Sequence, residues 1–470
     1  MLKAKNMTQK NSYWKYTWVV FSIMAIVFGS CKITQPYQQQ KSIAGDNLYR
    51  NGAATDSTNI ANLSWKQLFN DAALQSLIQE GIANNLDLKV AVARIKGAAA
   101  NFKQSQQALL PTLSASPSVT AQKVASTQFG NPYNFTLSLN SGWEADIWGR
   151  LSSAKRATLA ALLKSDAYKR AVQTQLVANI ATDYYLLLAY DAQLEVTQKT
   201  LALRKEEVET MKVLKESDVV TGAAVVQSAA NRYSVEITIP DLKRNIRETE
   251  NALSVLLGRN PDSIARTALD NQIISTELKT GVPAQLLANR PDVQQAELQV
   301  RNSFELINVA KASFYPALTI TASGGWSSAN LGNTFNASSI FANITAGLLQ
   351  PIFNKGLNKQ RLTVAKANQE EDLATFKKTV LTAGQEVSDA LYSYTSAVDK
   401  ETLRAQQIAY LQKSVEYTKE LLKYSSATNY TDVLTSEQSL LAAQLNSISD
   451  KLQKLTAMVT LYASLGGGWR

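Results

Sequence analysis

The side chains that most often carry out chemistry in proteins are scarce in this sequence. It contains no histidine and a single cysteine, Cys31, among 470 residues. Zinc sites, disulfide frameworks and acid–base catalysis by imidazole all depend on these two residue types. The sequence therefore predicts no catalytic residue, no metal site and no cofactor, and it favours a protein that is not an enzyme.

The chemistry open to Cys31 follows from its place near the amino terminus. Lysines up to Lys15 precede an apolar run from Trp18 to Phe28, which ends in Phe28-Gly29-Ser30-Cys31. This layout is typical of a secretory signal, and its last four residues resemble a bacterial lipoprotein box. We expect residues 1–30 to be a lipoprotein signal peptide and Cys31 to receive a covalent lipid. The alternative is a membrane anchor with an incidental cysteine, but the run is short of the about 20 residues that a spanning helix needs.

An internal repeat organises the rest of the chain. Residues recur at an offset of 205, which drifts to 208 near the ends: Asn84, Asp87, Ala91, Pro111, Leu113, Ile147 and Gly258 answer Asn289, Asp292, Ala296, Pro316, Leu318, Ile352 and Gly466. So long a period argues against a short-repeat solenoid. We expect a lipidated linker over residues 31–64, a first structural repeat over 65–258, an inter-repeat linker over 259–285 and a second repeat over 286–466. Residues 467–470 are expected to be a flexible tail after a glycine helix stop.

Each repeat contains a predicted pair of strands, over about 113–143 and about 317–349. Apolar and polar residues alternate there with period two, as in a half-buried strand. Four strands with open edges need closure, above all in a bilayer, where every backbone polar group must be paired. Strands of about ten residues match the length that crosses an outer membrane at a tilt. Closure implies oligomerisation, and three chains would give twelve strands.

Very long helical hairpins are predicted after the strands, over about 152–258 and 357–466. No proline or glycine occurs between Ser152 and Glu216, and apolar residues there recur every seven positions. Such spacing is typical of coiled-coil packing, and about 65 residues at 1.5 Å rise would reach roughly 100 Å. Pro240 should kink or locally break its helix. The charged run at residues 204–207 is expected to be a solvated helix face, and Asp71 and Asp87 are expected to cap the two helices that precede the strands.

Three stretches of the chain resemble signature sequences of one family. They are Trp-Glu-Ala-Asp-Ile-Trp-Gly-Arg at 143–150, Gln-Pro-Ile-Phe-Asn-Lys-Gly at 350–356 and Asn-Arg-Pro-Asp-Val at 289–293. From about Trp65 to Gly466 the chain is similar to TolC-like outer-membrane factors, in particular to their lipoprotein efflux branch, which is NodT-like. The resemblance implies an α+β membrane protein. Its fold would be a trimeric α/β-barrel duct, to which each chain gives four transmembrane β-strands and long coiled-coil α-helices.

The same resemblance implies partners and a location. A homotrimer would sit among outer-membrane lipids of a Gram-negative bacterium, lipid-anchored and extending into the periplasm. It would export drugs or other small molecules passively when docked to an inner-membrane pump through a periplasmic adaptor. The net charge of +10 includes the lysines of the leader, so the remaining excess is mild and predicts no nucleic-acid partner.

Two turns between the long helices would form the far end of the tunnel, at Ser217–Ala224 and Ser425–Thr431. We expect the adaptor to dock there, on Asp218, Gly222, Thr428 and Asn429. Asp432 belongs to Thr431-Asp-Val-Leu434, which resembles the family's second-repeat tip motif.

In that motif the aspartate faces the lumen, so three copies would form a ring of carboxylates that attracts cations. The alternative is that Asp432, or Thr431, merely caps the last helix. The family's closing salt bridge is not expected, because the basic residue often found four positions before Asp432 is Thr428 here and its first-repeat counterpart is Val225. Hydrogen bonds from tip side chains or packing by Leu434 are the alternatives for closure.

A second function class stays open at this point. The chain could be a structural envelope lipoprotein that tethers through coiled coils without conducting. The alternating strands favour the duct. Multidrug efflux, metal export and protein secretion all use ducts of this kind, and the sequence does not separate them.

Overall fold

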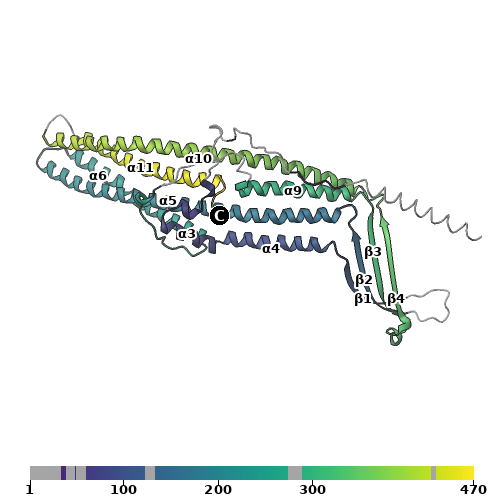
Figure 1. Ribbon diagram of the computed structural model, residues 1–470. Helices are drawn as coiled ribbons and strands as arrows, with labels where there is room; N and C mark the ends of the chain where they lie inside the picture. Colours follow the sequence, from purple (N-terminus) through teal and green to yellow (C-terminus); the bar gives the residue numbers. More distant parts are fainter. Residues whose placement is uncertain (1–32, 39–47, 49–59, 122–132, 274–287, 425–429) are drawn as a thin grey trace, which may run out of the picture. The chain divides into compact units, whose positions relative to one another are not determined.

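The computed structural model describes residues 33–38, 48, 60–121, 133–273, 288–424 and 430–470 (Figure 1). The chain divides into two compact units. The first is drawn from Met1–Gln39, Ala98–Leu162 and Leu298–Leu373, and the second from Gln40–Gly97, Leu163–Glu297 and Ala374–Arg470. Each unit takes segments from both halves of the sequence, so the compact units cut across the two sequence repeats.

Helices dominate both units. They are α2 (Trp65–Leu68), α3 (Ala72–Asn84), α4 (Leu86–Gln107), α5 (Arg150–Glu216), α6 (Gly222–Glu236), α7 (Thr238–Leu256), α9 (Pro291–Ala312), α10 (Leu357–Tyr424) and α11 (Tyr430–Ser464). With 67 residues in α5 and 68 in α10, the prediction of very long helices is confirmed. No helix in the described part of the chain is both long and apolar enough to cross a membrane.

The break between α6 and α7 lies where Pro240 was expected to act. Proline has no amide hydrogen, so Pro240 cannot donate to the carbonyl of Glu236, the residue at which α6 ends. The hydroxyl of Thr238 donates to the carbonyl of Val235 over 2.8 Å and satisfies one of the acceptors at the break. The predicted interruption is confirmed.

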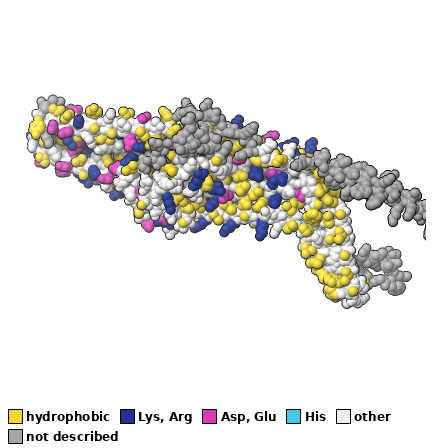
Figure 2. All heavy atoms as spheres, viewed as in Figure 1, with side chains coloured by type: hydrophobic (Ala, Val, Ile, Leu, Met, Phe, Trp, Pro, Cys, Tyr) yellow, Lys and Arg dark blue, Asp and Glu magenta, His cyan; other side chains and the backbone are white. Residues whose placement is uncertain are grey.

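One antiparallel sheet in the first unit holds β1 (Thr112–Ala121), β2 (Tyr133–Ala145), β3 (Ala317–Ser328) and β4 (Ile340–Leu349) in that order. Leu137 pairs with Trp326, and one position further Ser138 pairs with Gly325. The register continues this alternation across the sheet, so one face is mostly apolar and the other mostly serine, threonine and asparagine. Figure 2 shows hydrophobic side chains gathered over the strands. The expected four strands are confirmed, and within one chain β1 and β4 are open edges.

The internal repeat is visible in two glycines that the sequence pairs. Gly258 follows α7 with φ 70°, and Gly466 follows α11 with φ 89°. A Cβ on Gly258 would lie 2.6 Å from the carbonyl oxygen of Asn84, and one on Gly466 would press even closer on the carbonyl of Asn289. Only glycine combines this backbone conformation with such an approach. Both repeats therefore use the same device to close their helical segments.

The C-terminal residues are packed, which corrects the expectation of a flexible tail. Leu465 is fully buried. The indole of Trp469 donates to the carbonyl of Asn289 over 3.2 Å, and the guanidinium of Arg470 donates to the side chain of Asn289 over 2.8 Å. The tail thus contacts a residue that begins the second repeat.

Asp71 caps α3 as predicted. Its carboxylate accepts from the backbone amide of Ala73 over 2.8 Å and from the hydroxyl of Tyr184 over 2.7 Å. Burial raises the pKa of Asp71, but hydrogen bonds from Thr267, Tyr184, Gln272 and the backbone outweigh it, so the pKa lies below its ordinary value.

The prediction that Asp87 caps α4 is wrong. Asp87 lies inside the first turn of the helix. Asn85 takes the capping role, since its side-chain oxygen accepts from the amide of Leu88 over 3.0 Å. Both residue types cap helices well, so the choice between them depended on a helix boundary that residue type alone does not fix.

Candidate gate and docking site at the helical tips

The first tip turn joins α5 to α6 in the second unit, within the expected stretch Ser217–Ala224. Asp218 has a left-handed conformation with φ 55°. Its amide donates to the carbonyl of Lys215 over 3.0 Å, and the amide of Val219 donates to the carbonyl of Leu214 over 2.9 Å. These two bonds form a Schellman motif that ends α5 and places Asp218 at the position where glycine is most common.

Gly222 is not required by the fold at this turn. It is the first residue of α6, and a Cβ there would meet no described atom closer than the side chain of Lys215, at 3.8 Å. The backbone conformation that favours glycine occurs at Asp218 instead. The described part of the chain therefore gives no steric reason for glycine at position 222.

The second tip turn contributes Asp432 to the described structure, while Thr428 and Asn429 lie outside the described residues. Helix α11 begins at Tyr430, so Thr431 and Asp432 are both in its first turn. Neither occupies the position before the helix, so the alternative in which one of them is the N-cap is wrong. A carboxylate in the first turn still interacts favourably with the helix dipole.

An apolar cluster holds the two tip turns together. Met211 of α5 packs with Tyr430 and Leu434 of α11, and all three are buried. Partly buried residues from the other tip segments surround them: Leu214, Val220, Ala224, Val225 and Leu422. Val225 is the first-repeat counterpart of the position where the family often has a basic residue. Here it packs against the apolar cluster. Packing by Leu434, one of the alternatives for closure, is thus present within one chain.

Tyr430 adds a buried hydrogen bond between α11 and α6. Its hydroxyl donates to the Oγ atom of Ser228 over 3.0 Å, and both residues are buried. Burial raises the pKa of Tyr430, and the nearby carboxylate of Glu207 raises it further. The hydroxyl therefore stays protonated and able to donate at physiological pH.

An ion network centred on the buried Arg204 links three helices near the tips. The guanidinium of Arg204 on α5 lies 2.8 Å from the carboxylate of Glu207 and 2.5 Å from that of Glu437 on α11. The ammonium of Lys419 on α10 lies 2.6 Å from the other oxygen of Glu437. Arg204 is only 2% exposed. The expectation that residues 204–207 form a solvated face is therefore wrong for Arg204, which is an interior residue.

The lipidation candidate Cys31 lies outside the described residues. The structure does describe residues 33–38, which follow shortly after it. Thr34 packs against Gly149, between the end of β2 and the start of α5. The side-chain amide of Asn308 on α9 donates to the carbonyl of Gln35 over 3.0 Å. The segment after the cysteine is thus held at the junction between strands and helices of the first unit.

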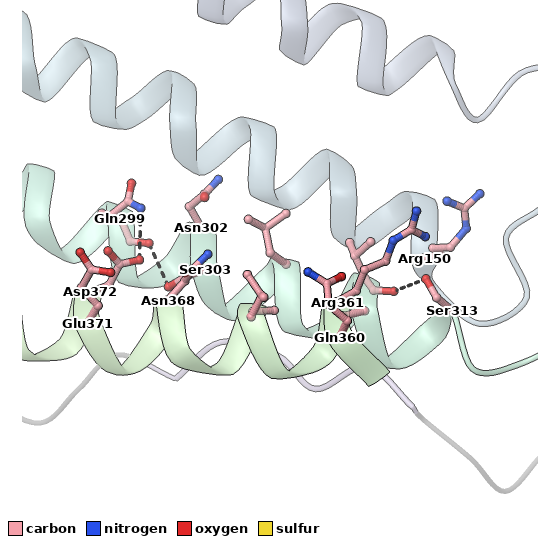
Figure 3. A pocket seen from close by; sticks show the side chains of 15 residues that line it. Arg150, Gln299, Asn302, Ser303, Ser313, Gln360, Arg361, Asn368, Glu371 and Asp372 are labelled. Atoms are coloured by element: carbon pink, nitrogen blue, oxygen red, sulfur yellow. Dashed lines mark hydrogen bonds between the residues drawn. The ribbon is translucent and has the colours of Figure 1, made fainter. Parts of the chain in front are cut away.

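A groove of about 540 Å³ lies between α9 and α10 in the same unit. Figure 3 shows Arg150 and Arg361 at one end and Glu371 and Asp372 at the other. Gln299 donates to the carboxylate of Asp372 over 3.1 Å. Among the described residues no group of three or more histidine, cysteine, aspartate or glutamate side chains could hold a metal ion.

Comparison with known proteins agrees with this architecture. A family model for outer membrane efflux proteins matches residues 77–259 and 282–467. The chain is 30% identical over 464 residues to a probable efflux pump outer membrane protein of Pseudomonas putida, TtgC, and the match covers 95% of both chains. It is 28% identical over 457 residues to the cation efflux system protein CusC of Escherichia coli, covering 95% of this chain and 98% of that one. The outer-membrane channel OprN superposes with a TM-score of 0.87 at 23% identity, covering 93% of this chain and 100% of that chain.

Long helices, an amphipathic four-stranded sheet and these matches together define an outer-membrane channel. The chain belongs to the outer membrane efflux protein family. It is the outer-membrane channel component of an efflux system in a Gram-negative envelope, and the comparisons support this role rather than a tether that does not conduct. The relatives reported above are named as efflux proteins and channels, not as enzymes.

Proposed function

We propose that three copies of this chain form a duct through which drugs or other small molecules leave the cell passively. A periplasmic adaptor and an inner-membrane pump would deliver the substrate and supply the energy. The observation that carries this proposal is the sheet, which combines an apolar face, a polar face and two open edges.

These three properties suit a barrel built from several chains. In a bilayer the unpaired backbone groups of β1 and β4 have no water to bond, so each edge needs another strand. Strand β4 of one copy would run antiparallel to β1 of the next, because neighbours in the sheet already alternate in direction. Twelve strands from three copies would close the barrel, with the apolar face toward lipid and the polar face toward the lumen.

The assembly itself can be tested on the purified protein. Native mass spectrometry in detergent should give three copies, and the same sample should form conducting channels in a planar bilayer. A stable monomer, or a trimer that never conducts with or without adaptor, would contradict the duct.

A lipid on Cys31 would support the same location. Thr34 is held beside Gly149 at the base of β2, and the three residue-to-residue steps from Cys31 to Thr34 span at most about 11 Å. The acyl chains would therefore enter the bilayer next to the strands. Trp148 and Tyr315, whose ring centroids lie 5.2 Å apart at the same junction, are the aromatic types found at membrane interfaces.

Replacing Cys31 with serine is expected to abolish incorporation of labelled palmitate without releasing the protein from the outer membrane. A closed barrel is embedded in the membrane by its strands and does not depend on a lipid for its attachment. Membrane fractionation followed by extraction with salt and then detergent measures this. Release of the variant by salt alone would show that the lipid, and not the strands, holds the protein.

Asp432 is proposed to line the constriction at the tunnel end. Three carboxylates around one pore would favour cations, and Asp432→Ala is expected to reduce the ratio of cation to anion permeability several-fold. Reversal potentials in salt gradients measure the ratio. Asp241→Ala is the matched control, because Asp241 occupies the first turn of α7 as Asp432 occupies that of α11. If the two variants had the same ratio of cation to anion permeability, Asp432 would not line the pore.

The adaptor is proposed to dock on the tips, at Asp218, Gly222, Thr428 and Asn429. An added Cβ at position 222 meets only an ordinary contact among the described residues. A small residue there instead suits close approach by another chain.

A further inference from the structure

A polar pocket of about 410 Å³ lies in the second unit, where α9 begins and α11 ends. Its lining residues come from four helices, α5, α9, α10 and α11, and from Arg290, which precedes α9. The polar side chains among them include Thr174, Gln175, Asn179, Thr182, Glu386 and Thr460. A volume of this size accommodates a small organic molecule. Hydroxyl, amide and carboxylate groups thus surround one space that can hold a polar ligand.

The charged residues that line the pocket leave it one negative charge in excess. They are Arg290, Asp292 and Glu386. The Nε and Nη2 atoms of Arg290 lie 3.0 Å and 2.6 Å from the carboxylate of Asp292, and its Nη1 atom lies 2.7 Å from Glu386. Nη1 also donates to the carbonyl of Ser464 over 2.9 Å, so the guanidinium is turned to groups of the chain and is poorly placed to hold an anion. No hydrogen bond or ion pair in the described part of the chain engages the second carboxylate oxygen of Glu386, which is therefore available to a cation.

Thr174 brings a buried hydroxyl to the pocket. It is 9% exposed, and its Oγ1 atom has no hydrogen-bond partner among the described residues. Other threonines of α5 donate to the carbonyl four residues earlier, as Thr197 and Thr200 do over 2.7 Å and 2.9 Å. An unpaired buried polar atom costs free energy, and a ligand in the pocket would remove this cost. Gln175 donates through its amide nitrogen to Asn179 over 2.7 Å, so its amide oxygen is left as a further acceptor.

The pocket opens on the side of the long helices that faces away from Leu48, Leu63 and Asp71. Residues two positions apart in a helix point about 200° apart, in nearly opposite directions. On three helices a pocket residue stands two positions from a residue that packs against one of those three: Thr182 and Tyr184 on α5, Glu386 and Gly384 on α10, and Thr460 and Tyr462 on α11. In a duct such an added layer belongs on the outside, because on the inside it would fill the lumen. The pocket therefore faces the lumen, a placement that rests on the proposed function.

We propose that this pocket binds organic cations that carry a primary ammonium group as they pass along the duct. An ammonium group has three donors and no acceptor. The groups that the described chain leaves available are acceptors: the second oxygen of Glu386, the hydroxyl of Thr174 and the amide oxygen of Gln175. The excess negative charge adds attraction in a partly enclosed space. Three copies would place three such pockets around the lumen, about 40 Å along α11 from Asp432.

Binding is measured by isothermal titration calorimetry, with spermidine as the probe and the purified protein in detergent. Glu386→Gln removes the negative charge but keeps the shape of the side chain, and we expect it to weaken binding about tenfold. Thr174→Val removes only the hydroxyl and should weaken binding about threefold. Because that hydroxyl has no partner in the described chain, Thr174→Val should fold at least as well as the unaltered protein. The matched control is Asp389→Asn, at an exposed acid one turn along α10 that does not line the pocket, and its affinity should be unchanged.

The same variants are then compared in planar bilayers. Spermidine should reduce the current through the unaltered protein, and Glu386→Gln should raise the concentration needed for this block by the same factor. Equal affinity of Glu386→Gln and Asp389→Asn, or tighter binding of inorganic phosphate than of spermidine, would overturn the pocket. So would a spermidine site that Asp432→Ala abolishes and Glu386→Gln leaves intact, because that site would lie at the tips. Binding as predicted by a protein that never conducts would keep the pocket and contradict the duct.

Discussion

Replacing Arg204 with methionine is expected to lower the free energy of unfolding of the tip by about 3 kcal/mol, because removal of one partner leaves buried charge uncompensated. Glu207 and Glu437 each have side chains only 15% exposed and both pair with this guanidinium. Lys419 keeps one contact with Glu437, whereas Glu207 has no second cation among its ion pairs in the described part of the chain. Hydrogen exchange of α5 and α11 amides near the tip measures the loss locally, and the thermal midpoint measures it globally.

An exposed ion pair on the same helix provides the control for this result. Lys199 and Glu195 lie 2.6 Å apart with side chains 73% and 66% exposed, and such surface pairs contribute less than about 1 kcal/mol. Lys199→Met should therefore change little. The triple change Arg204→Met, Glu207→Leu and Glu437→Leu should recover much of the stability, since a hydrophobic replacement of a whole buried ion network is often neutral or better. If Arg204→Met were as mild as Lys199→Met, the network would not hold the tip.

At Arg204 two features of the sequence predict opposite environments, a buried one and a solvated one. Leu201, Arg204, Val208 and Met211 are spaced three, four and three, and all four are buried. Arg204 therefore occupies a core position of the same seven-residue pattern that predicts coiled-coil packing. Its charge and its charged neighbours favoured a solvated face. The pattern was the better guide, and a carboxylate three residues away was the sign that an interior arginine would have a partner.

The strands were predictable because their signal is local. Alternation with period two is read within ten residues, and the register observed between β2 and β3 keeps the apolar residues of both strands on one face. The packing of the C-terminal residues was not predictable in this way. It depends on the carbonyl of Asn289, which is remote in sequence, and a run of three glycines carries no local sign of that contact.

The role of Asp432 could be predicted only in part from the sequence. Its motif indicated a place at the start of the last helix, and the structure places it in the first turn of α11. Whether its carboxylate faces a pore depends on copies of the chain that no single sequence or single chain describes.

Replacing Gly325 with alanine is expected to weaken the pairing of β2 with β3 and to cost the barrel about 1–3 kcal/mol, the usual effect of inserting a methyl group where there is no room. An added Cβ would lie 2.9 Å from the Cα atom of Ser138 and closer still to the carbonyl oxygen of Leu137. Both neighbours are backbone atoms, so no side chain can turn away and the strands must separate. The temperature at which the purified oligomer dissociates on a denaturing gel should fall.

Gly347→Ala provides the control in the same sheet. Gly347 lies in β4, one of the two strands that form an edge in a single chain, and no described atom lies within 4 Å of a Cβ added there. If the edges of the sheet close between copies, position 347 will have a neighbour in the assembly that it lacks in one chain. Gly347→Ala should leave the folding of the chain unchanged and can affect only the yield of oligomer. Equal dissociation temperatures for Gly325→Ala and the unaltered protein would show that β2 and β3 are not paired as described.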